Sequence, residues 1–387
     1  MTLDMLDEGS AGRSSIQMHE ALGAIGAHLE SDISADALLV GTTVLERFAD
    51  RAMDLLADVL VGPSLTDDDF ARVRQLRLHR LAQLRDVPGV VADRAFTALL
   101  YGADPYGHTP LGHERSLTAM TADDVRRFHR EMLRPGETTL IAVGDCQHAD
   151  VVRMAERAFS GWLGSPPPPT RADVGLLQPT PLHIVPRSGA SQSELRIGHV
   201  AVARDTPDYY ALVAANQVLG GQFVSRINLN LREDKGFTYG ARSAFDFRRR
   251  PGPFALQASV DTAATARAIE ESLGEIAAIR GPRPVTPEEL QLGIASLTRG
   301  YARNFETADQ IARAIAQIVL HDLPDDYFAQ FVPTMERLTP EAVTAAARRH
   351  LDPDRLTTLV VGDLDVIGRD LASLGLGEPN VLVASEI

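Results

Sequence analysis

Residues 120–145 read MTADDVRRFHREMLRPGETTLIAVGD, and residues 338–363 read LTPEAVTAAARRHLDPDRLTTLVVGD. The two stretches align without a gap at an offset of 218 residues. In each, a threonine (Thr121 or Thr339) can cap an amphipathic helix, a proline turn follows, and a strand rich in Ile, Leu and Val closes the unit. A repeat at this distance is far too long for a solenoid, so it predicts two duplicated domains.

The segments around the two copies indicate helices packed against sheets. In the second half we expect strands at 182–185, 194–199, 239–247 and 254–260, and helices at 206–219, 223–235, 262–279 and from 286 onward. Thr262 and a Thr286–Glu289 capping box are expected to begin the last two helices. In the first half we expect a helix at 14–23, strands at 27–33 and 37–44, and helices through 45–132. This order favours an α+β sandwich in each half over an alternating, doubly wound fold.

A proline-rich stretch separates the two halves. Ser165–Thr170 reads SPPPPT, which cannot form a helix and predicts a stiff, extended linker. We therefore place a first domain at 1–163, a linker at 164–179, a second domain at 180–376 and a tail at 377–387.

The first half is shorter than a full copy of the second. Two strands and two helices precede the central strand pair of the second half, whereas little more than one helix precedes the pair of the first half. Either the true start of the chain lies upstream or a partner supplies the missing strands. We favour the upstream start, because an uncovered sheet would be poorly soluble.

Composition excludes several classes of function. The 387 residues suffice for two domains that each bury a core. The formal net charge of −14 disfavours nucleic-acid binding along a basic face. No apolar run reaches the roughly 18 residues needed to cross a bilayer, and the N-terminus shows no signal-peptide pattern. Cys146 is the only cysteine, so the chain has no internal disulfide.

Short motifs in a fixed order identify a family. The first half contains Met5-Leu6, Arg13-Ser14, Ala52–Asp58, Pro105–Gly107 and Val143–Asp145, and the second contains Gly220-Gly221, Ser225-Arg226, Leu231-Arg232, Gly236 and Tyr239. On these residues the chain resembles the M16 (insulinase or pitrilysin-like) metallopeptidases of the short bacterial and mitochondrial-processing type. The resemblance implies two α/β sandwich domains of the LuxS/MPP-like type that form half of a clamshell.

The zinc motif of that family is lost here. Active members carry HxxEH, in which two histidines bind zinc and the glutamate activates the metal-bound water. Alignment on Met5-Leu6 puts Asp4 at the second histidine, Leu3 at the catalytic glutamate and Arg80 at or near the third ligand. Arginine cannot coordinate a cation. We therefore expect no metal site in this chain.

The remaining histidines do not replace the motif. His19-Glu20 with His28, and His108 with His113, lack the helical spacing of two ligands around a glutamate. We interpret them as ordinary surface or loop residues.

The substrate-binding half of the family's machinery is retained. The resemblance assigns substrate binding to an arginine and a tyrosine, which match Arg232 and Tyr239. Gly236 predicts a helix that ends just after Arg232, before a strand that begins at Tyr239. Gly220-Gly221 is expected to stop the preceding helix. This arrangement predicts that a guanidinium and a phenol are presented together to a peptide.

The leading hypothesis is the zinc-free subunit of a heterodimeric M16 peptidase. It would be inactive alone, and a partner carrying HxxEH would supply zinc. An inert M16-fold scaffold or peptide-binding protein is the alternative, against which the retention of Arg232 and Tyr239 speaks. An autonomous zinc peptidase conflicts with Leu3, Asp4 and Arg80. The sequence leaves the peptide, the partner and the compartment undetermined; the cytoplasm is the default, and a periplasmic location would require an upstream start.

Overall fold

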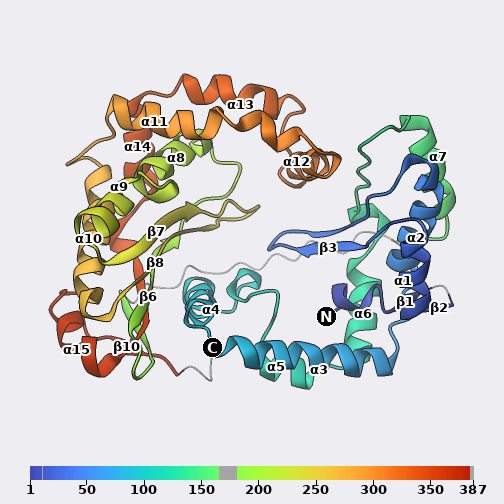
Figure 1. Cartoon of the computed structure of the whole chain (residues 1–387), viewed down its shortest axis with the longest axis horizontal. Coiled ribbons are helices and arrows are strands. Elements are labelled where there is room, and N and C mark those ends of the chain that lie inside the picture. Colours follow the sequence, from blue (N-terminus) through green and yellow to red (C-terminus); the bar gives the residue numbers. More distant parts are fainter. Residues whose placement is uncertain (11, 165–180, 384–387) are drawn as a thin grey trace. The chain divides into compact units, whose positions relative to one another are not determined.

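The computed structural model describes residues 1–10, 12–164 and 181–383. The predicted SPPPPT linker lies outside the described residues. The chain forms two compact units (Figure 1), each assembled from separate stretches of sequence. The first unit comprises Met1–Gln83, Pro110–Arg171 and Arg303–Asp322, and the second unit comprises Leu84–Thr109, Ala172–Ala302 and Leu323–Ile387.

The second unit is built on a six-stranded sheet with the order β10-β5-β9-β6-β8-β7. β5 pairs in parallel with β9 and β10, and the other neighbours are antiparallel. All four predicted strands that precede the repeated unit are present, with bounds shifted by a few residues. The strands are β5 (Leu182–Pro186), β6 (Gln192–Val200), β7 (Thr238–Phe245), β8 (Pro253–Asp261), β9 (Thr357–Gly362) and β10 (Asn380–Val381).

Helices cover both faces of this sheet (Figure 1). Because side chains alternate along a strand, Val360 of β9 joins the larger core while Leu359 and Val361 join the smaller one. The larger core is closed by α8 (Tyr209–Asn216), α10 (Thr265–Ile279), α11 (Pro287–Thr298), α13 (Tyr327–Glu336), α14 (Pro340–His350) and α15 (Leu364–Ala372). The smaller core is closed by α4 (Pro88–Tyr101).

The position of α4 differs from the predicted domain boundaries, which put this helix in the first domain. Its apolar face, with Ala92, Ala95 and Phe96, fills the second face of the sheet. Arg196 of β6 donates to Asp93 at 2.7 Å, and the Tyr101 hydroxyl donates to the carbonyl of Pro251 at 3.0 Å. A helix from the first half of the chain therefore covers the second face of this sheet.

The first unit is mainly helical. Its helices are α1 (Ser15–Gly23), α2 (Ala49–Val61), α3 (Asp67–Leu84), α5 (Glu114–Ala119), α6 (Ala122–Met132), α7 (His148–Ala158) and α12 (Ala308–Leu320). Two small antiparallel pairs accompany them: β1 (Gly9–Ser10) with β2 (Arg13–Ser14), and β3 (Glu30–Ile33) with β4 (Leu38–Gly41). α12 comes from the predicted second domain, and its Arg313 pairs with Glu30 of β3 at 3.4 Å.

Local cap chemistry predicted several helix starts correctly. Thr121 and Thr339 accept hydrogen bonds from the backbone at the starts of α6 and α14, and Thr286 forms a capping box with Glu289 in α11. The expectation for Thr262 is wrong, because Asp261 accepts from the Ala263 amide and begins a short 3-10 turn before α10.

The strand ends of the two repeated units differ. Residues 357–362 form the fully buried β9, but the aligned residues 139–144 form no strand. Leu140 is 41% exposed, whereas its counterpart Thr358 is 1% exposed. β9 is held between β5 and β6, and no described segment of the first unit pairs with 139–144. A strand needs a neighbour for its backbone hydrogen bonds, so residues 139–144 form no strand although their sequence resembles that of β9.

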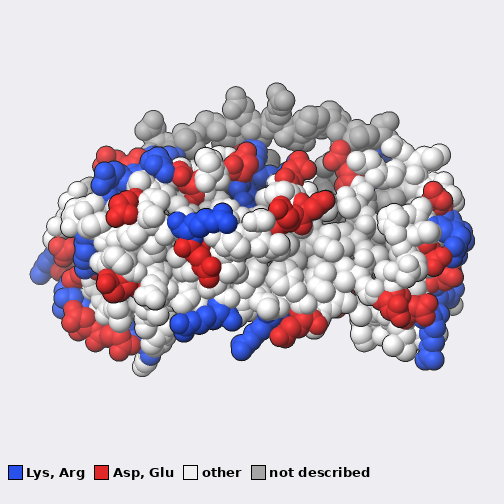
Figure 2. All heavy atoms as spheres, turned by 90° about the horizontal axis from the view of Figure 1, so that it is seen from above, with Lys and Arg blue, Asp and Glu red and all other residues white. Residues whose placement is uncertain are grey.

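Charged side chains of both signs are mixed on the surface. On the face that Figure 2 shows, basic side chains lie beside acidic ones and do not merge into one basic surface. Among the described residues, no helix combines the length and apolar character needed to span a membrane.

Candidate functional site

Arg232 lies on a short helical segment that ends at a left-handed glycine. The segment runs through α9 (Arg226–Asn228) and a π-helical turn (Leu229–Asp234), so it extends two residues beyond Arg232. Gly236 has a φ of +65°, as predicted, and the Phe237 amide donates to the Leu231 carbonyl at 2.8 Å. The backbone on either side of Arg232 is therefore held in place.

The Arg232 side chain has few internal partners. It is 34% exposed, and its Nε lies 3.4 Å from a carboxylate oxygen of Glu233. Its Cζ lies over the Phe223 ring at 4.2 Å from the centroid. No hydrogen bond joins this guanidinium to another of the described residues, so its N–H groups remain available to a ligand.

Arg226, on the same helix, shows the opposite arrangement. It donates to both carboxylate oxygens of Glu289, at 2.7 and 2.6 Å. It also donates to the carbonyls of Arg283 at 2.6 Å and Pro284 at 2.9 Å. Although burial alone would raise the pKa of Glu289, the bonds from Arg226 lower it overall. Arg226 therefore links its helix to Glu289 and to the loop at Arg283 and Pro284, whereas Arg232 makes no comparable contact within the described fold.

Tyr239 lies in a β-bulge at the start of β7. The pairing of β7 with β8 shifts register between Thr238 and Ala241. The Thr238 hydroxyl lies 2.6 Å from the Ser259 carbonyl and 2.9 Å from the Gly240 carbonyl, and accepts from the Gly240 amide at 3.1 Å. Tyr239 is 91% exposed. Bulges redirect side chains, and this one presents the phenol to solvent.

Asn228 connects the segments that carry these side chains. It is buried, its Oδ1 accepts from the Ala241 amide at 2.8 Å, and its Nδ2 donates to the Gln222 carbonyl at 3.2 Å. One amide side chain thus ties the residue before Phe223 to the bulge that carries Tyr239. Sequence reasoning did not identify Asn228 or Phe223. The only signal for Asn228 was a polar residue between the apolar residues Ile227 and Leu229.

The paired glycines before this site have a packing role as well as the predicted one. The π-helical turn does end at Gly221. In addition, a Cβ on Gly220 would lie 2.5 Å from the Ser243 hydroxyl, and one on Gly221 would lie 2.9 Å from the Asn216 carbonyl. Gly220 lets this turn pack directly against β7, and Gly221 lets it pack against the last residue of α8.

The residues at the positions where we expected the zinc motif do not form a zinc site. Leu3 and Asp4 lie in a 3-10 turn (Leu3–Met5) of the first unit. Asp4 pairs with Arg77, which also donates to the carbonyls of Pro110 at 2.9 Å and Leu111 at 3.1 Å.

Arg80, the predicted occupant of the third ligand position, is exposed, and no ion pair joins it to a described residue. Asp4 is paired instead with Arg77, one helical turn earlier on α3, and with the N-terminal ammonium of Met1 at 3.1 Å. Within residues 1–10, 12–164 and 181–383, no group of three or more His, Cys, Asp or Glu side chains is arranged to hold a metal ion.

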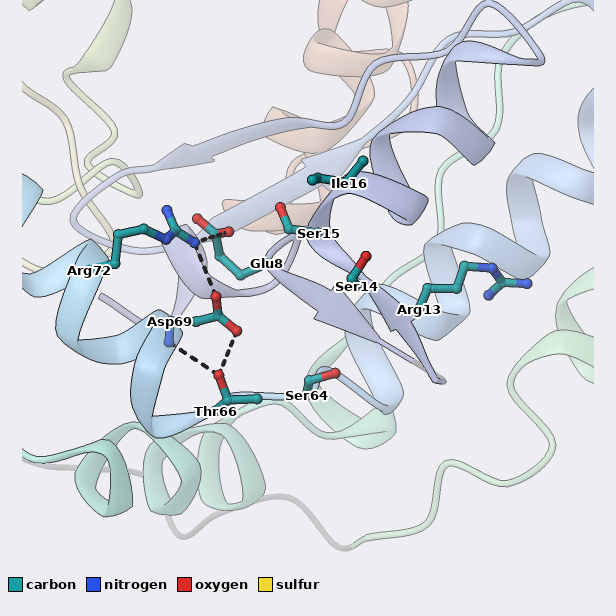
Figure 3. A pocket seen from close by; sticks show the side chains of 9 residues that line it. All are labelled: Glu8, Arg13, Ser14, Ser15, Ile16, Ser64, Thr66, Asp69 and Arg72. Atoms are coloured by element: carbon teal, nitrogen blue, oxygen red, sulfur yellow. Dashed lines mark hydrogen bonds and ion pairs between the residues drawn. The ribbon is translucent and has the colours of Figure 1, made fainter.

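The first unit contains a shallow pocket of about 490 Å³ (Figure 3). Its arginines are already paired: Arg72 with Glu8 and with Asp69 at 3.2 Å, and Arg13 with Asp58 at 2.5 Å. The lining is completed by Ser14, Ser15, Ile16, Ser64 and Thr66. Because its charges are neutralised within the chain, we do not assign it a function.

Comparisons with known proteins agree with this architecture. Residues 4–112 match the family model "Insulinase (Peptidase family M16)", and residues 119–297 match "Peptidase M16 inactive domain". An uncharacterized zinc protease of Mycobacterium leprae is 23% identical over 350 residues, which are 90% of this chain and 78% of that protein.

Two solved structures share the fold. A peptidase M16 inactive domain from Pseudomonas fluorescens has a TM-score of 0.87 at 24% identity and covers 94% of this chain and 87% of that chain. A protease from Helicobacter pylori has a TM-score of 0.83 at 17% identity and covers 93% and 88%. The two family models lie in order and together cover most of the chain, so this protein consists of two M16-type domains and belongs to the M16 (insulinase) peptidase family.

Proposed function

We propose that this chain is the zinc-free, substrate-binding subunit of a heterodimeric M16 peptidase. The observation that supports the proposal best is the contrast between the two arginines of one helix. Arg226 makes four hydrogen bonds within the fold, whereas the guanidinium of Arg232 makes none to the described residues. Tyr239, beyond the Gly236 turn, is 91% exposed on a backbone held by Thr238 and Asn228. Exposed polar groups on a rigid support suit ligand binding.

The chemistry of the two side chains fits a peptide bond under attack. Arg232 would donate to backbone carbonyls of the substrate. The Tyr239 hydroxyl would donate to the oxyanion that develops on the scissile carbonyl, which is worth about 3–4 kcal/mol for one donor. Leu3 and Asp4 offer no replacement for the histidine and glutamate of the zinc motif. The partner would therefore contribute HxxEH and its zinc, and Arg232 and Tyr239 would act in trans.

The test is reconstitution with an HxxEH-bearing M16 chain encoded by a neighbouring gene. We expect no peptide cleavage by either chain alone, with zinc present, and cleavage by the mixture. Tyr239→Phe in the mixture should lower kcat/KM by about 10²–10³-fold, and Arg232→Ala should also lower it.

Two outcomes would contradict the proposal. Zinc-dependent cleavage by the isolated chain would make it an autonomous peptidase. Full activity of a mixture that contains both Arg232→Ala and Tyr239→Phe would instead favour the inert scaffold.

A further inference from the structure

Phe223 is an exposed aromatic residue with one well-defined polar neighbour. The side chain is 60% exposed, although it follows a segment whose helix packs tightly against β7. Its ring lies beneath the Arg232 guanidinium, with 4.2 Å between Cζ and the ring centroid. A phenylalanine this exposed gains less from burial than a core residue does, and the contact with Arg232 uses the face of its ring.

The contact changes what Arg232 can offer. Arginine is a long side chain with several rotatable bonds, and an exposed one samples many rotamers. A ring beneath the guanidinium restricts these rotamers without occupying any N–H group, because the attraction is to the ring face. Among the described residues, the one competing ion-pair partner is Glu233, whose carboxylate lies 3.4 Å from Nε and is itself 53% exposed. Stacking therefore orders Arg232 and leaves its donors free.

The ring is itself attached to the rest of the site. Asn228 holds the carbonyl of Gln222, the residue before Phe223, and the amide of Ala241, just after the bulge that carries Tyr239. The support beneath Arg232 and the support of Tyr239 thus depend on one buried amide.

We propose that Phe223 is a positioning residue that orders the Arg232 guanidinium for peptide binding. The inference rests on the proposed substrate-binding role of Arg232, but its structural part can be measured separately. Phe223→Ala removes the ring, Phe223→Leu keeps apolar bulk without a π face, and Phe223→Tyr keeps the π face. Val366→Ala is the control, because Val366 is similarly exposed, at 58%, on α15.

The first measurement is the Nε–H NMR signal of Arg232, assigned by its loss in Arg232→Lys. Phe223→Ala and Phe223→Leu should shift this signal and increase its exchange with water, whereas Phe223→Tyr and Val366→Ala should not. An unchanged Arg232 signal in Phe223→Ala would overturn the positioning role, whatever the peptide affinities are.

The second measurement is the affinity of the full chain for fluorescein-labelled insulin B chain, used as a generic extended peptide and followed by anisotropy. We expect Phe223→Ala and Phe223→Leu to weaken peptide binding about threefold, and Phe223→Tyr to bind the peptide as tightly as the wild type does. In the background of Arg232→Ala, Phe223→Ala should have no further effect.

The outcomes separate the two proposals. A full additional loss in the double variant, or normal binding by Phe223→Leu, would show that Phe223 contacts the peptide directly and would overturn the inference. Binding by the wild type that is insensitive to Arg232→Ala would overturn the proposed function instead, while the NMR result would still decide the positioning role.

Discussion

Arg226 and Arg232 share one short helix but differ in burial and hydrogen bonding. The Arg226 side chain is 5% exposed and is paired with Glu289, whereas that of Arg232 is 34% exposed and stacks on Phe223. Burying a guanidinium is favourable only when its donors are satisfied. An arginine that stays partly exposed with its donors free costs the fold little and remains available to a ligand.

This contrast predicts unequal effects of the two alanine substitutions on stability. Arg226→Ala should lower the free energy of unfolding by about 2–3 kcal/mol, because it leaves Glu289 and two carbonyls without their donor. Arg232→Ala should change it by no more than about 0.5 kcal/mol. Chemical denaturation of the two variants and the wild type measures both values. Equal losses would mean that Arg232 also supports the fold.

Sequence reasoning at the residue scale succeeded mostly where the cause is local, although the local cap prediction for Thr262 was wrong. Thr121, Thr286 and Thr339 cap their helices, and Gly236 adopts the left-handed conformation, because each depends on neighbours within a few residues. Phe223 was missed because its contact with Arg232 depends on side-chain rotamers.

At the scale of elements, close packing of a glycine turn against β7 positions the candidate site. Gly220 and Gly221 leave no room for side chains against Ser243 and Asn216. The helix of Arg232 follows this turn, so the packing sets where that helix begins. By contrast, Gly274, inside α10, has no neighbour within 4 Å of an added Cβ.

Two glycine-to-alanine changes should therefore differ in sign. Gly220→Ala should destabilise the chain by about 1–3 kcal/mol, because the new methyl group would lie 2.5 Å from the Ser243 hydroxyl. Gly274→Ala should stabilise it by up to about 1 kcal/mol through helix propensity. Thermal melts of both variants provide the comparison. Destabilisation by Gly274→Ala would show that α10 is constrained at this position by more than propensity.

The elements also show what a local pattern cannot predict. The helical half of each repeat forms as expected, but the strand half depends on partners far away in sequence: β9 has β5 and β6, and no described strand of the first unit pairs with 139–144. Likewise, nothing near α4 in the sequence indicates that its apolar face, including Phe96, belongs against the sheet of the second unit. The strand at 357–362 and the position of α4 both depend on contacts between residues far apart in the sequence.

At the scale of the whole molecule, ionisable groups spread over both units couple stability to pH. Asp4 in the first unit, and Asp104, Asp208 and Glu289 in the second, have lowered pKa values, because arginines and other donors outweigh any cost of burial. Burial also lowers the pKa of His199, whose Nε2 accepts from the Asp352 amide at 3.3 Å, as a neutral ring does.

These shifts act in the same direction. Each group binds its proton more readily in the unfolded chain, so stability is present at higher pH and lost on acidification. The loss should begin below about pH 6.5 through His199 and steepen below about pH 4.5 through the carboxylates. Melting temperatures between pH 8 and pH 3 should follow this course, and His199→Asn should flatten the part between pH 5 and 6.5. A melting temperature that rises on acidification would contradict it.

Lys235 is the only lysine of the chain and Cys146 the only cysteine. Cys146 is exposed in the first unit, and the side chain of Lys235 is 38% exposed in the second, just beyond Arg232 on the same helix. The wild-type protein therefore carries one thiol and one side-chain amine for orthogonal labelling, one in each unit. A donor dye on Cys146 and an acceptor dye on Lys235 would let energy transfer measure the distance between the two units in a chain with no engineered residues. Under the proposed function, the dye on Lys235 would also report peptide binding near Arg232.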